Sequence, residues 1–423
     1  MRYLSSYKAI VHSFSVLFLA RFVATVFLCL LVITALFADF LSSEKPVYIV
    51  YNNKSYYPLF ASKTACDSLP NTRSGKQTWQ SVAEADWKHI PYQKAIWTLC
   101  PFDTKYTGKL KLQPPFSHEK TENQVFTHYF GTDRQDIDVL ASIIQGTKTS
   151  LSVGIGGLLL MAFLGIGLGG MAGYFGDTKW VLTRGQKYGI FMGIFLGFFY
   201  GFYIPRFNIE AAFLSQNVGQ AMLYILVGIG ILIGTIFLFA WIGKKMGFIS
   251  FLNQKTAFPI DKFITQLTDI QMALPVILIV IALSLMLPRS LFSLILIIGF
   301  SYYMGIARLT RSLASQVRNL PYIEAAEALG LSQIRILTKH ILPNVLPPLI
   351  SILLLSLADL ILLEAAFSFI NIGLPIETVS WGKILNQARD SPDSWWLSVF
   401  PALMIAGTAG SLKIVAHFRA ESQ

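Results

Sequence analysis

The stretch EAAEALGLSQIRILTKHILP, residues 324–343, is polar and helix-prone, although long apolar runs lie on both sides of it. Pro321, just before it, suits the first position of a helix, and Gly330 suits a C-terminal stop. Ser332 suits the N-cap of a second helix, which we expect to end at Pro343. The pattern therefore predicts an elbow of two short helices outside the bilayer.

The faces of these two helices indicate what the elbow does. Ile334, Leu337 and Ile341 fall on one side of the second helix, and the small residues Ala325 and Ala326 make the first helix narrow. A narrow elbow of this kind can dock against a partner protein. An amphipathic helix that lies in the membrane interface is the alternative that these residues leave open.

The composition indicates a membrane protein. Of the 423 residues, 54% are hydrophobic and 13% are charged, and the mean hydropathy is +0.55. One soluble core could not bury so many apolar runs, several of which approach the roughly 20 residues that a membrane-spanning helix needs. We expect eight spans, at residues 19–40, 150–175, 187–205, 219–242, 273–288, 291–307, 345–368 and 395–416.

Positive charge gathers in one set of loops. With the N-terminus in the cytoplasm, the short cytoplasmic segments sum to +12 and the short outer loops to zero. Lysine and arginine mark cytoplasmic loops, so we expect both termini in the cytoplasm. The overall charge of +11 then reflects topology rather than nucleic-acid binding. The apolar run Phe22–Phe40 exceeds the core of a signal peptide and predicts an uncleaved membrane helix.

Residues 41–148 have the composition of a small extracytoplasmic α/β domain. Asn52-Asn53 between two β-rich runs signals a hairpin, and Trp79, Trp87 and Trp97 can form a modest core. The rest of the chain divides into the first membrane helix with its cytoplasmic N-terminus (1–40), the second helix (149–176), an inserted pair of helices (177–257), a core (258–416) with a cytoplasmic loop (308–343), and a cytoplasmic tail (417–423).

Glycine recurs at every fourth position in the third span. A stripe of this kind lets two helix backbones approach closely inside lipid, so it predicts a packing face, with a substrate groove as the alternative. The five residues are Gly185, Gly189, Gly193, Gly197 and Gly201. The second span repeats the spacing with Gly165, Gly169 and Gly173, and the fourth with Gly230 and Gly234.

The reactive side chains form no catalytic pattern. The chain has no Walker-type phosphate loop, no H-E-x-x-H and no G-x-S-x-G, and its six histidines lack metal-ligand spacing. We therefore expect no catalytic residue, no metal and no cofactor in this chain. Cys66 and Cys100 both lie in the extracytoplasmic domain, where they can form a disulfide or remain two free thiols.

Asp359 and Glu364 are acidic residues inside the seventh span. A charge in lipid is costly unless it is paired or faces water. These two residues therefore either line a polar pathway, take part in proton coupling, or make a hydrogen-bonded contact between helices.

The motif EAAEALG, followed at a distance by HILP, resembles the EAA loop of ABC importer permeases. In that family the loop is a coupling helix that docks into a groove of the ATPase subunit. The resemblance assigns this role to Glu324, Ala325, Ala326, Gly330, Leu342 and Pro343.

Neighbouring segments extend the resemblance to dipeptide and oligopeptide permeases, over residues 125–176 and 258–410. They include FGTDRQDIDVLASIIQGTKTSLSVG, TDIQMALPVILIVIAL and LEAAFSFINIGLP. Several features depart from that family, among them a C-terminal tail, KIVAHFRAESQ, without the expected acidic ending. Residues 136–138 read Asp-Ile-Asp where the family usually has Gly-Arg-Asp, residues 177–257 look inserted, and the first outer loop is enlarged.

The resemblance implies both a fold and a function. The fold is an all-α polytopic bundle like that of type I ABC importer permeases, with two extra helices and the small outer domain. The function is that of the permease subunit of an ATP-driven peptide importer in a bacterial inner membrane. Its partners are a second permease, two ATPase subunits that bind ATP and Mg²⁺, an extracytoplasmic solute-binding protein and the lipid bilayer. The alternatives are an ATPase-independent, proton-coupled transporter that uses Asp359 or Glu364, and a membrane scaffold.

Overall fold

The computed structural model describes residues 2–51, 53–60, 68–71, 78–81, 87–88, 92–104, 111–121, 124–215, 218–246 and 250–421. The chain divides into two compact units. Unit 1 contains Met1–Ile155 and Leu354–Ser422, and unit 2 contains Gly156–Leu353. Helices α3 (Val139–Phe175) and α13 (Leu342–Phe369) each contribute residues to both units.

The described residues contain 6 helices long and apolar enough to cross a membrane, or up to 8 spans if each of two bent helix pairs counts as one. The bent pairs are Arg184–Tyr203 with Arg206–Ala212, at 42°, and Ile260–Met272 with Val276–Met286, at 89°. The polytopic helical class predicted from the sequence is therefore confirmed. The other spans are Leu19–Leu36, Val139–Phe175, Leu223–Lys245, Leu291–Arg318, Gln333–Phe369 and Trp396–Ala420.

Helix α3 begins earlier than the apolar pattern indicates. The sequence places the second span at residues 150–175, whereas the helix starts at Val139. Asp138 caps it, because its Oδ1 accepts the backbone N–H of Ala141 at 2.8 Å. Polar residues in the first turns, such as Lys148, conceal this part of the helix from a hydropathy search.

Unit 1 is built from α1 (Arg2–Leu36), α2 (Ala38–Leu41), α14 (Trp381–Arg389), α15 (Trp396–Glu421) and parts of α3 and α13. Gly382 lets α14 approach α13 closely, since a Cβ there would overlap the carbonyl of Ala365. The core cluster that joins these helices comprises Leu31, Leu151, Ala358, Ile361, Ala365, Trp381, Ile405, Ala409 and Leu412.

The segment between the first two spans is built mainly of short strands in its described residues, with one 3-10 turn at Pro58–Phe60. Its strands are β1 (Tyr48–Tyr51), β2 (Lys54–Tyr56), β3 (Ser68–Asn71), β4 (Thr78–Ser81), β5 (Lys94–Ile96), β6 (Ser117–Lys120) and β7 (Val125–His128). Strands β2, β1 and β5 form an antiparallel sheet in that order, while β3 pairs with β4 and β6 with β7.

The hairpin predicted around Asn52-Asn53 is confirmed, because Tyr51 pairs with Lys54 across a two-residue turn. Asn53 has a φ of 60°, in the left-handed region that asparagine tolerates well; Asn52 lies outside the described residues. Trp87 is buried against Ile49 as expected. Trp97 is half-buried in the same cluster, whereas the side chain of Trp79 is not described.

Of the two cysteines predicted to pair, Cys66 lies outside the described residues. Cys100 is buried as a free thiol, whose Sγ donates to Oδ1 of Asp138 at 3.5 Å. Burial and the neighbouring carboxylate raise the pKa of this thiol, which makes it a poor nucleophile. The pairing with Cys66 stays a prediction.

The turn before α3 explains how Asp-Ile-Asp replaces Gly-Arg-Asp. Asp133 accepts the backbone N–H groups of Gln135 and Ile137, both at 2.8 Å, and so closes the turn. Burial nevertheless raises the pKa of Asp133. Asp136 adopts a φ of 65°, a conformation natural for glycine and tolerated by aspartate. The backbone therefore keeps a glycine-like turn without the glycine.

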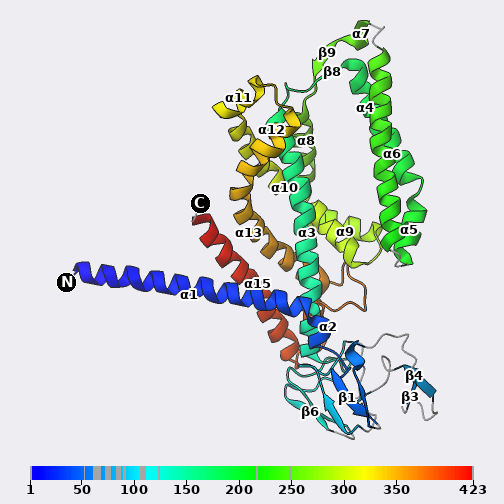
Figure 1. Cartoon of the computed structure of the whole chain (residues 1–423), viewed down its shortest axis with the longest axis vertical. Coiled ribbons are helices and arrows are strands. Elements are labelled where there is room, and N and C mark those ends of the chain that lie inside the picture. The colour runs from blue at the N-terminus through cyan, green and yellow to red at the C-terminus, as the bar shows by residue number, and fades with distance from the viewer. Residues whose placement is uncertain are drawn as a thin grey trace. The chain divides into compact units, whose positions relative to one another are not determined.

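Residues 177–257, which the sequence predicts to be an insertion, form a helical hairpin on a small β-ribbon. Strands β8 (Val181–Thr183) and β9 (Lys255–Ala257) pair antiparallel at its base. One arm is α4 (Arg184–Phe198), continued by a π-helical turn (Phe199–Tyr203) and α5 (Arg206–Leu214), and the other arm is α6 (Val218–Lys245), followed by α7 (Ser250–Asn253). The two arms run side by side in Figure 1.

The structure places all five predicted glycines of this hairpin against α6. A Cβ at Gly193 would lie 2.7 Å from Cα of Ile236, and one at Gly201 would lie 2.6 Å from the carbonyl oxygen of Gly228. Additions at Gly185, Gly189 and Gly197 would also overlap α6. Thr235 Oγ1 donates to the carbonyl of Gly193 at 2.9 Å, a hydrogen bond that this close approach permits.

Two other glycine series behave differently from each other. Gly165, Gly169 and Gly173 of α3 lie against α10 (Leu291–Arg318), where a Cβ would overlap the carbonyl of Ala307 or Arg311, or the side chain of Ile306. By contrast, a Cβ at Gly230 or Gly234 of α6 would meet nothing within 4 Å in the described structure. That pair does not pack as its spacing suggests.

Candidate functional site

The predicted elbow lies in unit 2, directly after α10. Helix α11 (Pro321–Ala328) has Pro321 at its first position, as the sequence predicts, because proline lacks only an N–H that has no helical partner there. Gly330 follows its C-terminus with a φ of +77°, which a side chain would strain. Helix α12 (Gln333–Ile336) begins after the extended N-cap residue Ser332.

The second helix does not end at Pro343, and this prediction was wrong. A π-helical turn at Leu337–Ile341 connects α12 to α13 without a break, so a single helical span runs from Gln333 to Phe369. Pro343 lies in the first turn of α13, and Pro347 and Pro348 lie within it. A π-helical turn and local adjustments in a membrane helix accommodate prolines that would end a water-exposed helix.

One apolar cluster mounts the elbow on unit 2. Ile323 and Ala326 of α11 are buried in it, as are Ile336, Leu337 and Ile341. They pack with residues from the end of α3, from α8 (Ile260–Met272) and from α10. These residues are Ala172, Tyr174, Phe175, Ile260, Ile264 and Ala314. The elbow is therefore packed firmly on its inner side.

The outer side of the elbow carries exposed apolar side chains. Leu329 is 82% exposed and Ile334 is 72% exposed, although Ile334 was expected to share a face with Leu337 and Ile341. Ile336, Leu337 and Ile341 are buried instead, so the buried face passes through Ile336 and Leu337 and leaves Ile334 outside. Two large apolar residues thus flank the turn at Gly330.

The structure separates the residues that the resemblance assigns to the coupling loop. Glu324, Ala325 and Pro343 are exposed, and so is Gly330. Ala326 is buried, and the half-buried Leu342 packs against the same cluster. The motif therefore consists of an outward set and an inward set, and the inward set fixes the elbow to its support.

Sequence reasoning missed the polar contacts that hold α11. Glu327 Oε1 forms an ion pair with Lys179 Nζ and accepts a hydrogen bond from Tyr174 Oη at 3.1 Å. Glu327 lies within the stretch quoted first, but nothing local to it identifies Lys179, which is 148 residues away. The only signal for Lys179 was its contribution to the positive charge of the loop 176–187.

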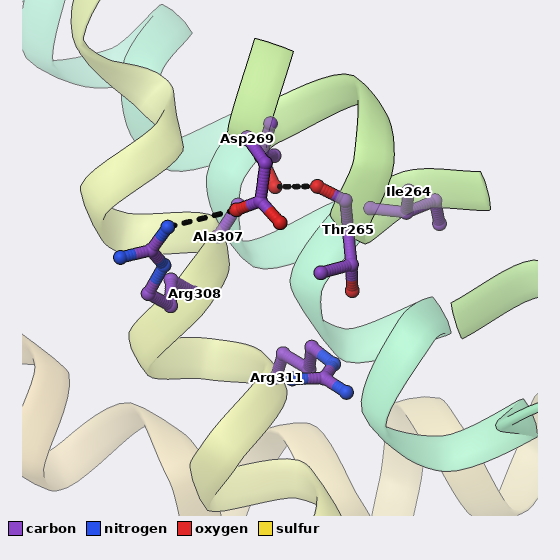
Figure 2. Close-up of a pocket in the computed structure, with 7 residues that line it drawn as sticks. Ile264, Thr265, Asp269, Ala307, Arg308 and Arg311 are labelled. Carbon is purple, nitrogen blue, oxygen red and sulfur yellow. Dashed lines mark hydrogen bonds and ion pairs between the residues drawn. The ribbon is translucent and has the colours of Figure 1, made fainter. Parts of the chain in front are cut away.

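Ion pairs also join α8 to α10, the helix that leads into the elbow. Arg311 binds both carboxylate oxygens of Asp261, and Arg308 Nη2 lies 2.8 Å from Oδ1 of Asp269. Figure 2 shows Asp269 facing Arg308 across the two helices. A pocket of about 260 Å³ lies beside them, lined by Ile264, Thr265, Thr268, Asp269, Ala307, Arg308 and Arg311. The bidentate Arg311–Asp261 pair and the charge-assisted Arg308–Asp269 contact fix the register of α8 on α10.

The two acidic residues of the seventh span occupy different environments in unit 1. Glu364 is fully buried, and its two oxygens accept hydrogen bonds from Ser150 at 2.6 Å and Ser368 at 2.7 Å. The side chain of Asp359 is 61% exposed and lies 3.8 Å from Lys413. Glu364 thus makes a contact between α3 and α13, whereas Asp359 is open to its surroundings.

These features define a polytopic helical membrane protein with a packed elbow that carries exposed apolar residues. Residues 246–418 match the family described as binding-protein-dependent transport system inner membrane component, which agrees with the resemblance inferred from the sequence. Residues 125–176, which also contributed to the resemblance, lie outside this match.

Individual relatives agree with the family. The chain is 39% identical over 156 residues to a putative peptide transport system permease protein of Brucella suis, a match that covers 37% of this chain and 53% of the relative. It is 30% identical over 156 residues to an oligopeptide transport system permease protein of Bacillus subtilis (37% and 51%). It is 34% identical over 150 residues to a probable D,D-dipeptide transport system permease protein of Escherichia coli (35% and 50%). The chain spans about half the length of these relatives.

Proposed function

We propose that this chain is the transmembrane permease subunit of an ATP-driven peptide importer and forms half of its translocation pathway. The family match and the peptide permease names of the relatives support this function. The observation that carries it is the elbow. Its inner side is packed on unit 2, while Leu329, Ile334 and Glu324 are exposed. Such exposed apolar residues on a rigid mount suit a partner surface.

In this proposal the elbow meets an ATPase subunit in the cytoplasm of a bacterial inner membrane. ATP and Mg²⁺ bind to two ATPase subunits, and this chain binds no cofactor. A second permease completes the pathway, and an extracytoplasmic binding protein delivers the peptide. ATP binding and the loaded binding protein bias two conformations of the permease pair. Both termini of this chain lie on the cytoplasmic side, as the charge distribution predicts.

A proton-coupled transporter that works through Asp359 or Glu364 is the rival function. The two serine hydrogen bonds satisfy Glu364 within the protein and support a structural role for it. Asp359 is exposed within a span, so in this proposal it faces either the pathway or the second permease. Uptake that persists in Asp359→Asn and Glu364→Gln variants argues against the rival.

The test is copurification followed by variants of the elbow. Purification in mild detergent should recover the chain with ATPase subunits, and recovery without any ATPase would overturn the proposal. Glu324→Lys and Gly330→Pro should abolish uptake while membrane insertion persists, since proline cannot adopt the φ of +77° at Gly330. Glu210→Lys, the same charge change on an exposed residue of α5, is the control.

A further inference from the structure

The base of the inserted hairpin is closed by its own hydrogen bonds. Asp177 Oδ1 accepts the backbone N–H of Lys262 at 3.0 Å and so caps the start of α8, which has no local side-chain cap. The carbonyl of Trp180 accepts the N–H of Phe258 at 2.6 Å, and the β8–β9 ribbon continues from there. The segment that enters the insert and the segment that leaves it are therefore hydrogen-bonded to each other and to the start of α8.

Lys179 extends from this base to α11. Its Nζ pairs with Oε1 of Glu327 and lies 4.2 Å from the ring centroid of Tyr174, whose hydroxyl donates to the same carboxylate. The Lys179 side chain is 16% exposed and that of Glu327 is 37% exposed, so water screens this pair less than a surface pair. The hydrogen bond from Lys179 lowers the pKa of Glu327.

The surrounding charges favour the same arrangement. Arg318, at the end of α10, adds to the positive potential at Glu327, and its guanidinium lies beside Gly176 at the end of α3. Asp261, next to the base of the insert, binds Arg311 of α10. The insert base therefore contacts α11 through Lys179, while Gly176 and Asp261, which adjoin the base in the chain, contact α10.

We propose that the inserted hairpin positions the coupling helix α11 through the Lys179–Glu327 pair, so that movement of the insert changes how the elbow transmits motion. This inference rests on the proposed function. Glu327 and Lys179 are positioning residues, because they act on the outward residues of the elbow through α11. Besides this pair, Asn344 donates a hydrogen bond to the Tyr322 hydroxyl of α11 at 3.2 Å, and Ile323 and Ala326 attach α11 through non-directional apolar contacts, which resist its rotation less.

A charge-exchange experiment on the assembled transporter tests this proposal. Lys179→Glu and Glu327→Lys should each lower peptide uptake per ATP hydrolysed by roughly tenfold, within the usual range of coupling between sites. The double exchange should restore it to within about twofold, because the opposite charges again face each other. Tyr174→Phe removes only one hydroxyl and should give a smaller loss, and Lys179→Arg should retain most of the coupling.

Lys244→Glu is the matched control, since Lys244 is an exposed residue in the last turn of α6, at the end of the hairpin nearest the base. If single exchanges prevent assembly, Tyr174→Phe decides the matter, and unchanged coupling in it overturns the proposal. Loss of coupling without recovery in the double variant overturns it as well. If the native chain assembles with no ATPase, the proposed function fails. If the native complex couples normally and the exchanges change nothing, only this inference fails.

Discussion

Helices α4 and α6 of the insert share a glycine spacing but not its consequence. The four glycines of α4, with Gly201 in the π-helical turn that continues it, face the backbone of α6, whereas Gly230 and Gly234 of α6 face open space in the described structure. The three glycines of α3 resemble those of α4, because each lies against α10. Spacing thus creates a narrow face, and only a neighbouring backbone turns that face into an interface.

The largest expected effect comes from breaking the α4–α6 interface. Gly189→Leu would place a side chain into the carbonyl of Phe239, with no flexible side chain to move aside. We expect a loss of more than about 3 kcal/mol of hairpin stability, at or above the usual range for overpacking. Thermal unfolding of the purified chain in detergent measures it. Gly230→Leu, the same change at an open position, should leave the unfolding midpoint nearly unchanged, and equal losses at both sites would contradict the comparison.

A smaller change tests whether α3 follows the same rule. Gly169→Ala adds one methyl group that overlaps the carbonyl of Ala307 in α10. We expect a destabilisation of about 1–3 kcal/mol. Gly167→Ala on the same helix meets nothing within 4 Å and should be neutral or slightly stabilising, because alanine favours helices over glycine. A neutral result at Gly169 would show that α3 and α10 separate without cost.

The smallest expected effect concerns the Lys179–Glu327 ion pair, a polar contact in contrast to these close-packed glycine interfaces. The folded pKa of Glu327 lies below its ordinary value of 4.5, so its contribution to stability is present above that pH and is lost as the pH falls through the lowered pKa. Unfolding midpoints of the native chain and of Glu327→Gln should differ at neutral pH and converge under acid conditions. A difference that grows on acidification would contradict the assignment.

The sequence predicted the elbow well where local chemistry controls the backbone. Pro321 and Gly330 bound α11 as expected, because their conformational limits need no tertiary partner. The predicted stop at Pro343 failed for the opposite reason. A π-helical turn and the surrounding membrane helices allow the chain to continue, and no local pattern reports them.

The candidate site could be predicted only in part. The motif predicted a site that includes Glu324 and Gly330, both of which are exposed, but Glu327 gained its partners from the loop after α3 and from Tyr174. Asp359 and Glu364 were equivalent in the sequence, yet one is exposed and the other is enclosed by two serines. Contacts across long separations in the chain have no local signature.

The sequence by itself determined the membrane class and the place of the elbow. Apolar length, turn chemistry and charge asymmetry are local or additive properties, so they can be read along the chain. Only the tertiary structure decided which glycines form interfaces, that Glu364 is buried, and that Lys179 pairs with Glu327. Those outcomes depend on which surfaces meet, and packing in three dimensions sets that.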